Sequence, residues 1–359
     1  MSTPANRHHA TPSSLPIGEH RPYIGRFAPS PSGPLHFGSL VSALASYAHA
    51  RQAGGLWHLR MENLDPPREE PGADEAILRA LEQHGLTWDG PVLYQSDRLE
   101  AYAEVLERLH AERLVYPCTC TRKDIRAMGG VYDGRCRERQ PDTVQPHAWR
   151  LKVYDAASVN SRGATVNLED EVRFHDLIQG PQRQNVRREA GDPIIKRKDG
   201  LFAYQLAVIV DDIHQQITHV IRGGDLLELT AGQINAFRIL GGEAPAFGHV
   251  PVALNAEGQK LSKQHHAPAL DPARAGSNLW QALVFLRQSP PPELRSAPVR
   301  EILDWALEHW DTGAVNGPDR EAPAAEYRKA PAADYRDKDR AASAEKSQPV
   351  DQQEQRNPS

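Results

Sequence analysis

The chain has 359 residues, 39% of them hydrophobic, and a formal net charge of −5 at neutral pH. This length is enough for two domains and a sizeable core, and the charge gives no overall basic signature, so any nucleic-acid contact must come from local patches. Residues 1–20 are rich in Ser, Thr, Pro and His without an apolar centre, which excludes a signal peptide, and no apolar run approaches the roughly 20 residues of a membrane span. We expect a cytoplasmic protein with a disordered leader over residues 1–20.

A short strand over Tyr23–Phe27 leads into a turn with three prolines and a glycine, and then into a helix. The helix is predicted from the spacing of its apolar residues, which are Leu40, Val41, Leu44, Ala45 and Ala48. A helix N-terminus after a rigid turn presents backbone N–H groups and a positive dipole end to an anion. His36 and Ser39 stand at this opening, so the segment indicates a phosphate site. An ordinary strand-to-helix connection is the alternative.

A second apolar run, Leu56–Met61, follows that helix, and this order is typical of a β-α-β unit with parallel strands. Ligands of such sheets bind at the carboxyl ends of the strands, where Glu62 stands. Helices are predicted over Asp74–His84 and after Ser96, which is expected to cap the second one. One face of that second helix is expected to pack in the core through Leu99, Tyr102, Ala103, Leu106 and Leu109.

The segment Tyr116–Arg139 differs in character because it contains all three cysteines of the chain, Cys118, Cys120 and Cys136. An odd, clustered set favours reduced thiols and a metal over a disulfide framework. Three thiolates and one further ligand satisfy tetrahedral zinc. The candidate fourth ligand is the phenol of Tyr132, an unusual choice where a histidine would be expected, and no histidine lies in this segment. Three free thiols are the alternative.

Weak alternation over Trp149–Gln179 predicts antiparallel strands, and Ile194–Lys198 followed by Asp199 and Gly200 predicts a hairpin. The strongly apolar run Leu201–Asp212 is expected to place Tyr204 in the middle of the sheet. The paired aspartates that end this run, Asp211 and Asp212, are candidate carboxylate ligands for the magnesium of a nucleotide.

Strands are predicted at His219–Arg222 and His249–Leu254, with a helix at Thr230–Leu240 between them. Two further helices are expected at about Asn278–Arg287 and Val299–Trp310. From Asp311 to Ser359 the chain has almost no large aliphatic residues, which predicts a disordered tail.

A polar loop after the last strand reads KLSK at Lys260–Lys263. Two lysines flanking a serine are suited to hold the β- and γ-phosphates of a nucleotide, although such a motif alone is usually chance. Together with RFAPSPSGPLHFGS at Arg26–Ser39, it resembles the catalytic domain of class I aminoacyl-tRNA synthetases. LHFG stands where that class has HIGH, and KLSKQ stands where it has KMSKS. LHFG lacks the second histidine, and Gln264 replaces the final serine.

Two further stretches, RMENLD at Arg60–Asp65 and VIRGGDLL at Val220–Leu227, are similar to the glutamyl/glutaminyl branch of that class, and the resemblance covers residues 23–265. It implies that His36 and Lys263 are catalytic and that ATP is bound by His36, Gly38, Ser39, Lys260, Ser262 and Lys263. The implied L-glutamate site is Arg26, Phe27, Ala28, Pro29, Ser30, Glu62, Tyr204 and Arg222. The chemistry agrees, because a dicarboxylic amino acid needs cations for its two carboxylates and an anion for its ammonium group. The resemblance also implies that Asp211 and Asp212 orient a loop or the adenosine and tRNA end and do not bind magnesium.

Only about two helices and the tail follow Gln264, too little for an anticodon-binding domain. The chain therefore resembles the glutamyl-queuosine tRNA(Asp) synthetase family, whose zinc site is similar to the Cys-x-Cys…Tyr-x-x-x-Cys pattern here. The resemblance implies an α/β, Rossmann-like nucleotide-binding catalytic domain over 21–265, a zinc-binding insertion at about 116–140, and a helical C-terminal part over 266–310. It also implies one structural Zn²⁺, Mg²⁺ with ATP, a monomer, and three substrates: ATP, L-glutamate and tRNA(Asp) carrying queuosine.

The implied reaction activates glutamate as glutamyl-adenylate and transfers it to the queuosine base in the anticodon. Three alternatives stay open. The chain is a truncated glutamyl-tRNA synthetase that charges a tRNA 3′ end, a non-catalytic tRNA-binding paralogue, or an interaction protein built on the zinc insertion and the tail.

Overall fold

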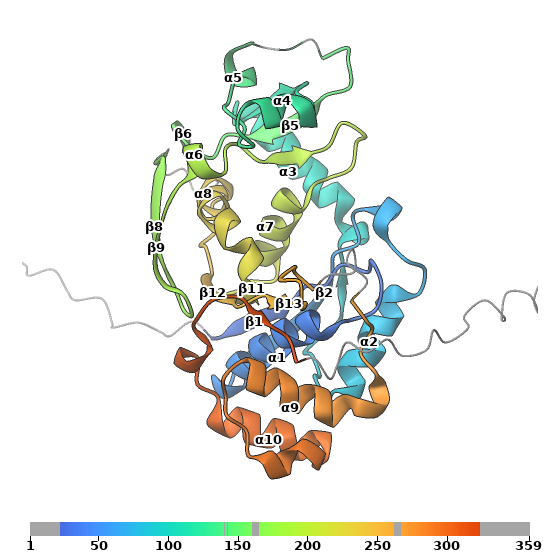
Figure 1. The fold of residues 1–359 in the computed structure, drawn as a ribbon. Coiled ribbons are helices and arrows are strands. Elements are labelled where there is room, and N and C mark those ends of the chain that lie inside the picture. Colours follow the sequence, from blue (N-terminus) through green and yellow to red (C-terminus); the bar gives the residue numbers. More distant parts are fainter. Residues whose placement is uncertain (1–21, 140, 142, 160–164, 262–266, 324–359) are drawn as a thin grey trace, which may run out of the picture.

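The computed structural model describes residues 22–139, 141, 143–159, 165–261 and 267–323 (Figure 1). The predicted leader over residues 1–20 lies outside these ranges. None of the helices in the described ranges combines the length and the apolar character that crossing a bilayer requires.

Parallel strands form the centre of the molecule. Strand β1 (Ile24–Phe27) pairs in parallel with β2 (Leu56–Met61), helix α1 (Phe37–Gln52) connects them, and β2 pairs in parallel with β3 (Leu93–Tyr94). This is the predicted β-α-β unit. Strands β11 (His219–Gly223) and β12 (Ala246–Val250) form a second parallel pair, and β11 lies beside β1. The residues that follow β1, β2, β11 and β12 line one cavity, so the carboxyl ends of these strands face the same side of the molecule.

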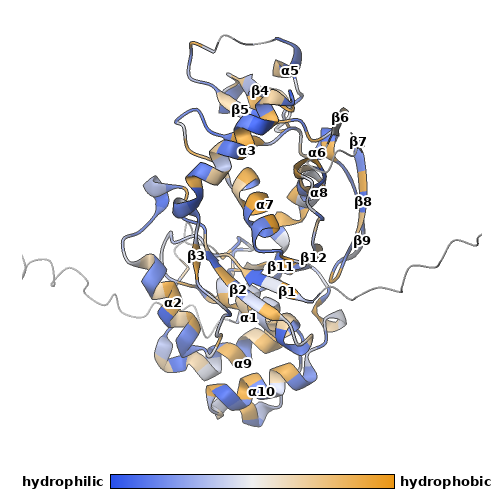
Figure 2. Cartoon of the chain, turned by 180° about the vertical axis from the view of Figure 1, so that it is seen from behind, coloured by the Kyte–Doolittle hydropathy of each residue, from blue (hydrophilic) through white to orange (hydrophobic). Residues whose placement is uncertain are grey.

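Helices cover both faces of these strands (Figure 1). Helices α1, α9 (Ala275–Phe285) and α10 (Val299–His309) belong to one hydrophobic cluster, which also holds α2 (Ala73–Gln83). Helices α3 (Leu99–Ala111), α7 (Tyr204–His214) and α8 (Thr230–Leu240) belong to a second cluster on the other face. Seen from behind, α2 and α10 carry both hydrophobic and hydrophilic residues (Figure 2), as expected of helices with one buried and one exposed face.

The cysteine-containing segment forms a separate layer at the end of the molecule away from α9 and α10 (Figure 1). Its antiparallel sheet has the order β10-β5-β4, formed by Ile194–Lys196, Ala148–Leu151 and Val115–Cys118. Two short helices, α4 (Arg122–Ala127) and α5 (Cys136–Arg139), follow β4.

The predicted antiparallel strands after Trp149 are present as two hairpins, and a short helix, α6 (Val186–Glu189), follows them. Strand β6 (Ala156–Val159) pairs with β7 (Thr165–Leu168), and β8 (Glu171–Asp176) pairs with β9 (Gly180–Asn185). The predicted turn at Asp199 and Gly200 is also present, because Arg197 and Leu201 are hydrogen-bonded across it.

The prediction that Tyr204 lies in the middle of the sheet is wrong. Tyr204 is the first residue of helix α7, and every residue of that helix from Leu206 to Asp212 is buried. A helix that is surrounded by protein is apolar on all sides, so its sequence lacks the 3.6-residue period that separates a helix from a buried strand.

Two boundary predictions are also corrected. Ser96 does not cap α3, because residues 95–98 form a 3₁₀ turn and the Ser96 hydroxyl accepts a hydrogen bond from Asn63. Leu99, expected in the core, is 49% exposed. The strand expected at His249–Leu254 is two strands, since β12 ends at Val250, Pro251 follows, and β13 (Ala253–Leu254) pairs elsewhere.

The prediction of a disordered tail from Asp311 onward is wrong for residues 311–323, which the structure describes. Strand β14 (Arg320–Glu321) pairs in parallel with β13, and the Asp319 carboxylate accepts the backbone N–H of Val252. Val315 and Ala322 are buried in the same cluster as α1. The composition of residues 311–359, averaged as one block, concealed these few anchoring contacts. Residues 324–359 lie outside the described ranges.

Candidate functional site

A cavity of about 540 Å³ opens at the carboxyl ends of β1, β2 and β11. It is lined by residues predicted for both substrates: Arg26, Phe27, Ala28, Pro29, Ser30, His36, Gly38, Ser39, Glu62, Tyr204, Arg222 and Lys260. Ser262 and Lys263, predicted for ATP, lie outside the described residues. The fold thus gathers residues from distant parts of the chain around a single cavity.

A buried ion cluster supports the floor of this cavity. One oxygen of Asp212, on α7, lies 3.3 Å from Arg26 Nε and 2.8 Å from Arg60 Nη2. Burial acts to raise the pKa of Asp212, but the guanidinium groups of Arg60 and Arg26 outweigh it and hold the pKa below its ordinary value. Asp212 therefore stays ionised and holds the side chain of Arg26, which lies within β1.

The expected roles of Asp211 and Asp212 are corrected by these contacts. Asp211 accepts hydrogen bonds from Arg98 Nε at 2.6 Å, Gln95 Nε2 at 2.8 Å and the Tyr102 hydroxyl at 2.8 Å. Both carboxylates are buried and neither lines the cavity. They connect α7 to α3 and to β1 and β2, so they stabilise the fold beneath the site.

Glu62 follows β2 and lines the cavity with a side chain that is only 10% exposed. Its carboxylate lies 3.6 Å from Arg60 Nη2, and its Oε1 has no hydrogen-bond partner among the described residues. Burial raises the pKa of Glu62, and Arg60 and Arg26 oppose the rise. A buried acceptor that lacks a donor is suited to hold a cationic group.

Arg222, on β11, differs from the other arginines of the site because its hydrogen-bond acceptors are all neutral. It donates to His249, Thr230 and the carbonyl of Leu226, and its Nη1 lies 3.4 Å from the Tyr204 hydroxyl. Among the described residues it forms no ion pair with a carboxylate, although it is buried, with only 5% of its surface exposed. A buried guanidinium group without a carboxylate is costly unless a ligand supplies one.

The charges that line the cavity do not balance. Three cationic side chains, Arg26, Arg222 and Lys260, line it together with two carboxylates, Glu62 and Asp225. One positive charge is left over among the lining residues. This excess favours a ligand with one net negative charge, and the positions of Arg222 and Glu62 favour one that carries both carboxylate and ammonium groups.

The other end of the cavity lies at the N-terminus of α1. The Nδ1 of His36 accepts the backbone N–H of Ser39 at 3.3 Å and so caps the helix. At Gly38, a Cβ would approach the His36 ring to 3.2 Å, so a larger residue would crowd the cap. Lys260 Nζ lies 2.5 Å from Asp225, a residue that the sequence did not single out. A helix N-terminus, an imidazole and a lysine are an arrangement suited to phosphates.

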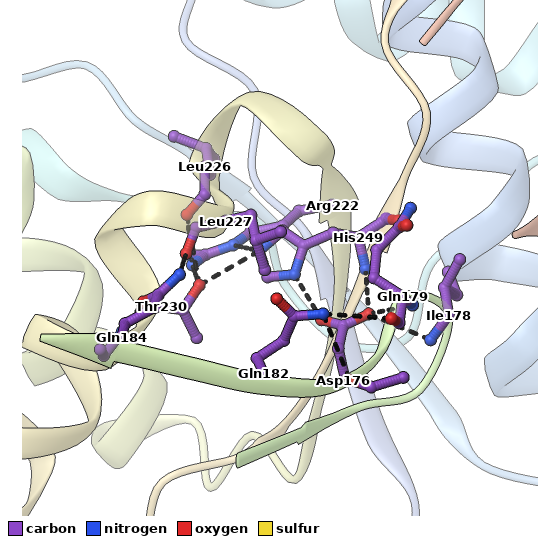
Figure 3. Close-up of polar contacts among 12 residues, drawn as sticks. Asp176, Ile178, Gln179, Gln182, Gln184, Arg222, Leu226, Leu227, Thr230 and His249 are labelled. Carbon is purple, nitrogen blue, oxygen red and sulfur yellow. Dashed lines mark hydrogen bonds and ion pairs between the residues drawn. The ribbon is translucent and has the colours of Figure 1, made fainter. Parts of the chain in front are cut away.

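Sequence reasoning missed the residues behind Arg222, which are drawn in Figure 3. Asp176, His249 and Thr230 are fully buried and hydrogen-bonded to one another or to Arg222. They come from β8, β12 and α8. No short motif joins them, so only the fold reveals the group.

The four predicted metal ligands lie together in the insertion. The sulfur atoms of Cys118, Cys120 and Cys136 all lie within 4.8 Å of one another, and the Cys120–Cys136 distance is 3.5 Å. Zinc–sulfur bonds of tetrahedral geometry separate thiolates by about 3.8 Å, so the sulfur positions fit such an ion. The Tyr132 oxygen is held beside them, accepting the backbone N–H of Cys136 at 2.9 Å. This group could hold a metal ion.

Comparisons with known proteins give a consistent result. The family model described as "tRNA synthetases class I (E and Q), catalytic domain" matches residues 24–274. The "Glutamyl-Q tRNA(Asp) synthetase" of Pseudomonas fluorescens is 49% identical over 296 residues, covering 82% of this chain and 93% of that protein. The protein of the same name from Thiobacillus denitrificans is 50% identical over 293 residues, covering 80% of this chain and 93% of its own.

Solved structures add a likeness in fold. A glutamate tRNA ligase from Elizabethkingia meningosepticum, in complex with its amino acid, aligns with a TM-score of 0.67 and 25% identity. The alignment covers 85% of this chain and 68% of the ligase. The glutamate-tRNA synthetase of Elizabethkingia anophelis aligns with a TM-score of 0.68 and 26% identity, covering 85% and 69%.

Proposed function

The chain belongs to the glutamyl-Q tRNA(Asp) synthetase family of class I tRNA synthetases, and on that premise we propose that it activates L-glutamate with ATP and transfers it to the queuosine base in the anticodon of tRNA(Asp). The observation that carries the proposal is the excess positive charge of the cavity around Arg222. Glutamate has two carboxylates and one ammonium group, and its single net negative charge balances that excess.

In the proposed complex, Arg26 and Arg222 bind the two carboxylates of glutamate between them. Glu62 binds the ammonium group, and the Tyr204 hydroxyl donates a further hydrogen bond. The backbone of residues 27–30 forms the wall beside the ligand. Support comes from the position of these groups around one cavity and from the unpartnered oxygen of Glu62.

The first chemical step is proposed to be in-line attack by the glutamate α-carboxylate on the α-phosphorus of ATP. A new oxygen–phosphorus bond forms, the bond to the β-phosphate breaks, and pyrophosphate leaves. His36, Lys260 and the N-terminus of α1 stabilise the charge on the phosphates, and we propose the same role for Gly38, Ser39, Ser262 and Lys263. Mg²⁺ bound with ATP would neutralise part of that charge. In the second step a hydroxyl of the queuosine ring attacks the acyl carbon and AMP leaves.

The test of the first step is glutamate-dependent exchange of radiolabelled pyrophosphate into ATP. We expect the purified protein to catalyse exchange with L-glutamate and to do so poorly with glutamine and aspartate. The absence of exchange with glutamate, measured with and without tRNA(Asp), would contradict catalysis and favour the tRNA-binding alternative. Exchange that is equal with glutamate and glutamine would contradict the role of Arg222.

The pH dependence of this exchange tests the role of Glu62. Because burial raises the pKa of its carboxyl, Glu62 takes up a proton at a higher pH than an ordinary glutamate does. The protonated form no longer attracts an ammonium group. We expect the KM for glutamate to rise as the pH falls through that raised pKa.

A Glu62→Gln variant separates this effect from titration of the substrate, whose own carboxyl titrates near about 4.3. We expect its KM for glutamate to be high at every pH and to lack the acid-side increase of the wild type. An acid-side increase that is identical in both proteins would assign the titration to the substrate and count against Glu62.

We also propose that the insertion holds one zinc ion through Cys118, Cys120, Tyr132 and Cys136. All four positions are then filled by protein, so the ion is structural. Metal analysis of the purified protein is expected to give one zinc per chain, and Cys118→Ser is expected to lose it.

Tyr132→Phe tests the fourth ligand. Phenylalanine keeps a ring beneath the guanidinium of Arg150, which lies 3.7 Å from the ring centre, and removes only the oxygen. We expect zinc affinity to fall at least about 10-fold. Tyr154→Phe is the matched control, since Tyr154 is also buried and lies 3.9 Å beneath Arg137. Equal zinc affinity in the two variants would remove Tyr132 from the ligand set.

A further inference from the structure

The group behind Arg222 is a buried chain of hydrogen bonds that runs from a carboxylate to the cavity (Figure 3). Arg222 Nε donates to His249 Nε2 at 2.9 Å. Its Nη2 donates to the Thr230 hydroxyl at 2.9 Å and to the Leu226 carbonyl at 3.3 Å. Its Nη1 lies 3.4 Å from the hydroxyl of Tyr204, a residue of the cavity wall.

The other nitrogen of His249 meets Asp176. Nδ1 of His249 lies 2.5 Å from Asp176 Oδ2, and both side chains are completely buried. The second oxygen, Oδ1, accepts three backbone N–H groups, those of Ile178 at 3.0 Å, Gln179 at 2.8 Å and His249 itself at 3.1 Å. Asp176 therefore uses one oxygen for the backbone and the other for the imidazole.

These contacts determine where the proton of the imidazole resides. A carboxylate only accepts hydrogen bonds, so Nδ1 carries the hydrogen that it donates to Oδ2. A guanidinium group only donates, so Nε2 must be the unprotonated nitrogen, whose lone pair accepts the hydrogen bond from Arg222. Burial acts to lower the pKa of His249, and although Asp176 opposes this, the pKa stays below its ordinary value. The imidazole is thus neutral and in a single tautomer.

We propose that Asp176 and His249 are positioning residues that hold Arg222 through a hydrogen bond to its Nε, so that its guanidinium group stays free of a direct ion pair with the described carboxylates and can form one with a bound carboxylate. The inference rests on the proposed function, because it gives Arg222 its ligand. A direct carboxylate partner would hold the arginine equally well but would cancel the charge that the substrate needs. The neutral imidazole keeps the Asp176 carboxylate out of direct contact with the guanidinium group, and it preorganises the arginine before the substrate binds.

Asp176→Asn tests this arrangement, because it replaces one carboxylate oxygen with an amide NH₂ group. The three backbone N–H groups require an oxygen at the Oδ1 position, so the amide nitrogen must take the place of Oδ2 and face His249 Nδ1. The imidazole must then accept at Nδ1 and carry its hydrogen on Nε2. That hydrogen opposes the Arg222 Nε–H, and the arginine turns away.

We expect Asp176→Asn to raise the KM for glutamate about 10- to 100-fold in pyrophosphate exchange, with the KM for ATP changed less than about twofold. His249→Phe removes the nitrogen that accepts the hydrogen bond from Arg222 Nε, so we expect it also to raise the KM for glutamate. His249→Gln is expected to recover most of the affinity, because its amide oxygen can accept from Arg222 Nε. A purely structural role of His249 predicts the same KM for glutamate in His249→Phe and His249→Gln.

The matched control is His84→Phe. His84 is also buried, and its Nδ1 donates to the Ala80 carbonyl, but it lies on the α2 side of the molecule away from the cavity. We expect it to leave both KM values unchanged within about twofold. An equal loss for glutamate and ATP in the Asp176 and His249 variants, or no loss in folded protein, would overturn the proposal.

The tautomer is also measurable directly and without activity, from the ¹⁵N–¹H correlations of the imidazole. The proposal requires the proton of His249 on Nδ1 in the wild type and on Nε2 in Asp176→Asn. A proton on Nε2 in the wild type would overturn it even if the variant failed to fold. Absent exchange with the expected tautomer would count against the proposed function, while the wrong tautomer with normal exchange would count against the positioning role alone.

Discussion

Replacing Arg222 with methionine is expected to lower kcat/KM for glutamate by roughly 10²- to 10³-fold in pyrophosphate exchange. Methionine fills a similar volume but leaves a carboxylate of the substrate buried without its cation, which costs about 3–4 kcal/mol, and each 1.4 kcal/mol is a factor of about ten. Arg26 cannot replace it, because Arg26 already shares Asp212 with Arg60. The KM for ATP is expected to stay within about twofold.

The control for this variant is Arg295→Met, which removes an exposed arginine that lies over Trp280, away from the cavity. Arg222→Lys retains a charge but loses the Nε that His249 accepts, so we expect an intermediate loss. Equal losses in glutamate and ATP affinity for Arg222→Met, or a loss no larger than that of the control, would contradict the glutamate pocket.

The largest expected effect on stability comes from Asp212→Asn. The substitution leaves the buried guanidinium groups of Arg26 and Arg60 without their shared carboxylate. Breaking a buried ion pair from one side typically lowers the free energy of unfolding by about 3–5 kcal/mol. Urea denaturation followed by circular dichroism measures the change. Asp199→Asn is the control, because its partner Arg197 is 39% exposed and such pairs contribute about 1 kcal/mol or less.

The pH dependence of this difference has a definite sign. The folded-state pKa of Asp212 is depressed, so its contribution is present above the unfolded-state value of about 3.9 and is lost as the pH falls through the folded-state pKa. The gap between wild type and Asp212→Asn should therefore be full at neutral pH and shrink only in acid. A gap no larger than that of Asp199→Asn at neutral pH would show that the cluster contributes little.

Much of the fold was predictable because its signals are local. The opening strand, the proline-rich turn and α1 lie within about thirty residues, and the helix at Thr230–Leu240 has the predicted bounds, ended by Gly241 at φ 74°. The fold class and the family inferred from RFAPSPSGPLHFGS and KLSKQ are confirmed by the family model and by relatives near 50% identity. Both motifs are contiguous in the chain, so they can be recognised without knowledge of the fold.

The remaining features depend on contacts between distant parts of the chain. Asp176 and His249 are 73 residues apart, and Arg26 and Asp212 are 186 residues apart. Neither pair has a spacing that a sequence pattern could reveal. Helix α7 was not predicted because it is buried on all sides and lacks a helical period in its sequence. Strand β14 was not predicted because it consists of only two residues paired with β13, within a segment of mostly polar composition.

The measurement that tests the central claim most directly uses radiolabelled glutamate, ATP and tRNA(Asp) with or without queuosine, followed by nuclease fragmentation and alkaline hydrolysis. We predict alkali-labile label only on queuosine-containing tRNA(Asp) and only in the anticodon fragment. Label at the 3′ end of tRNA(Glu) would make the protein a short glutamyl-tRNA synthetase, the alternative left open by its likeness to glutamate tRNA ligases. No label on any tRNA would contradict the transfer step altogether.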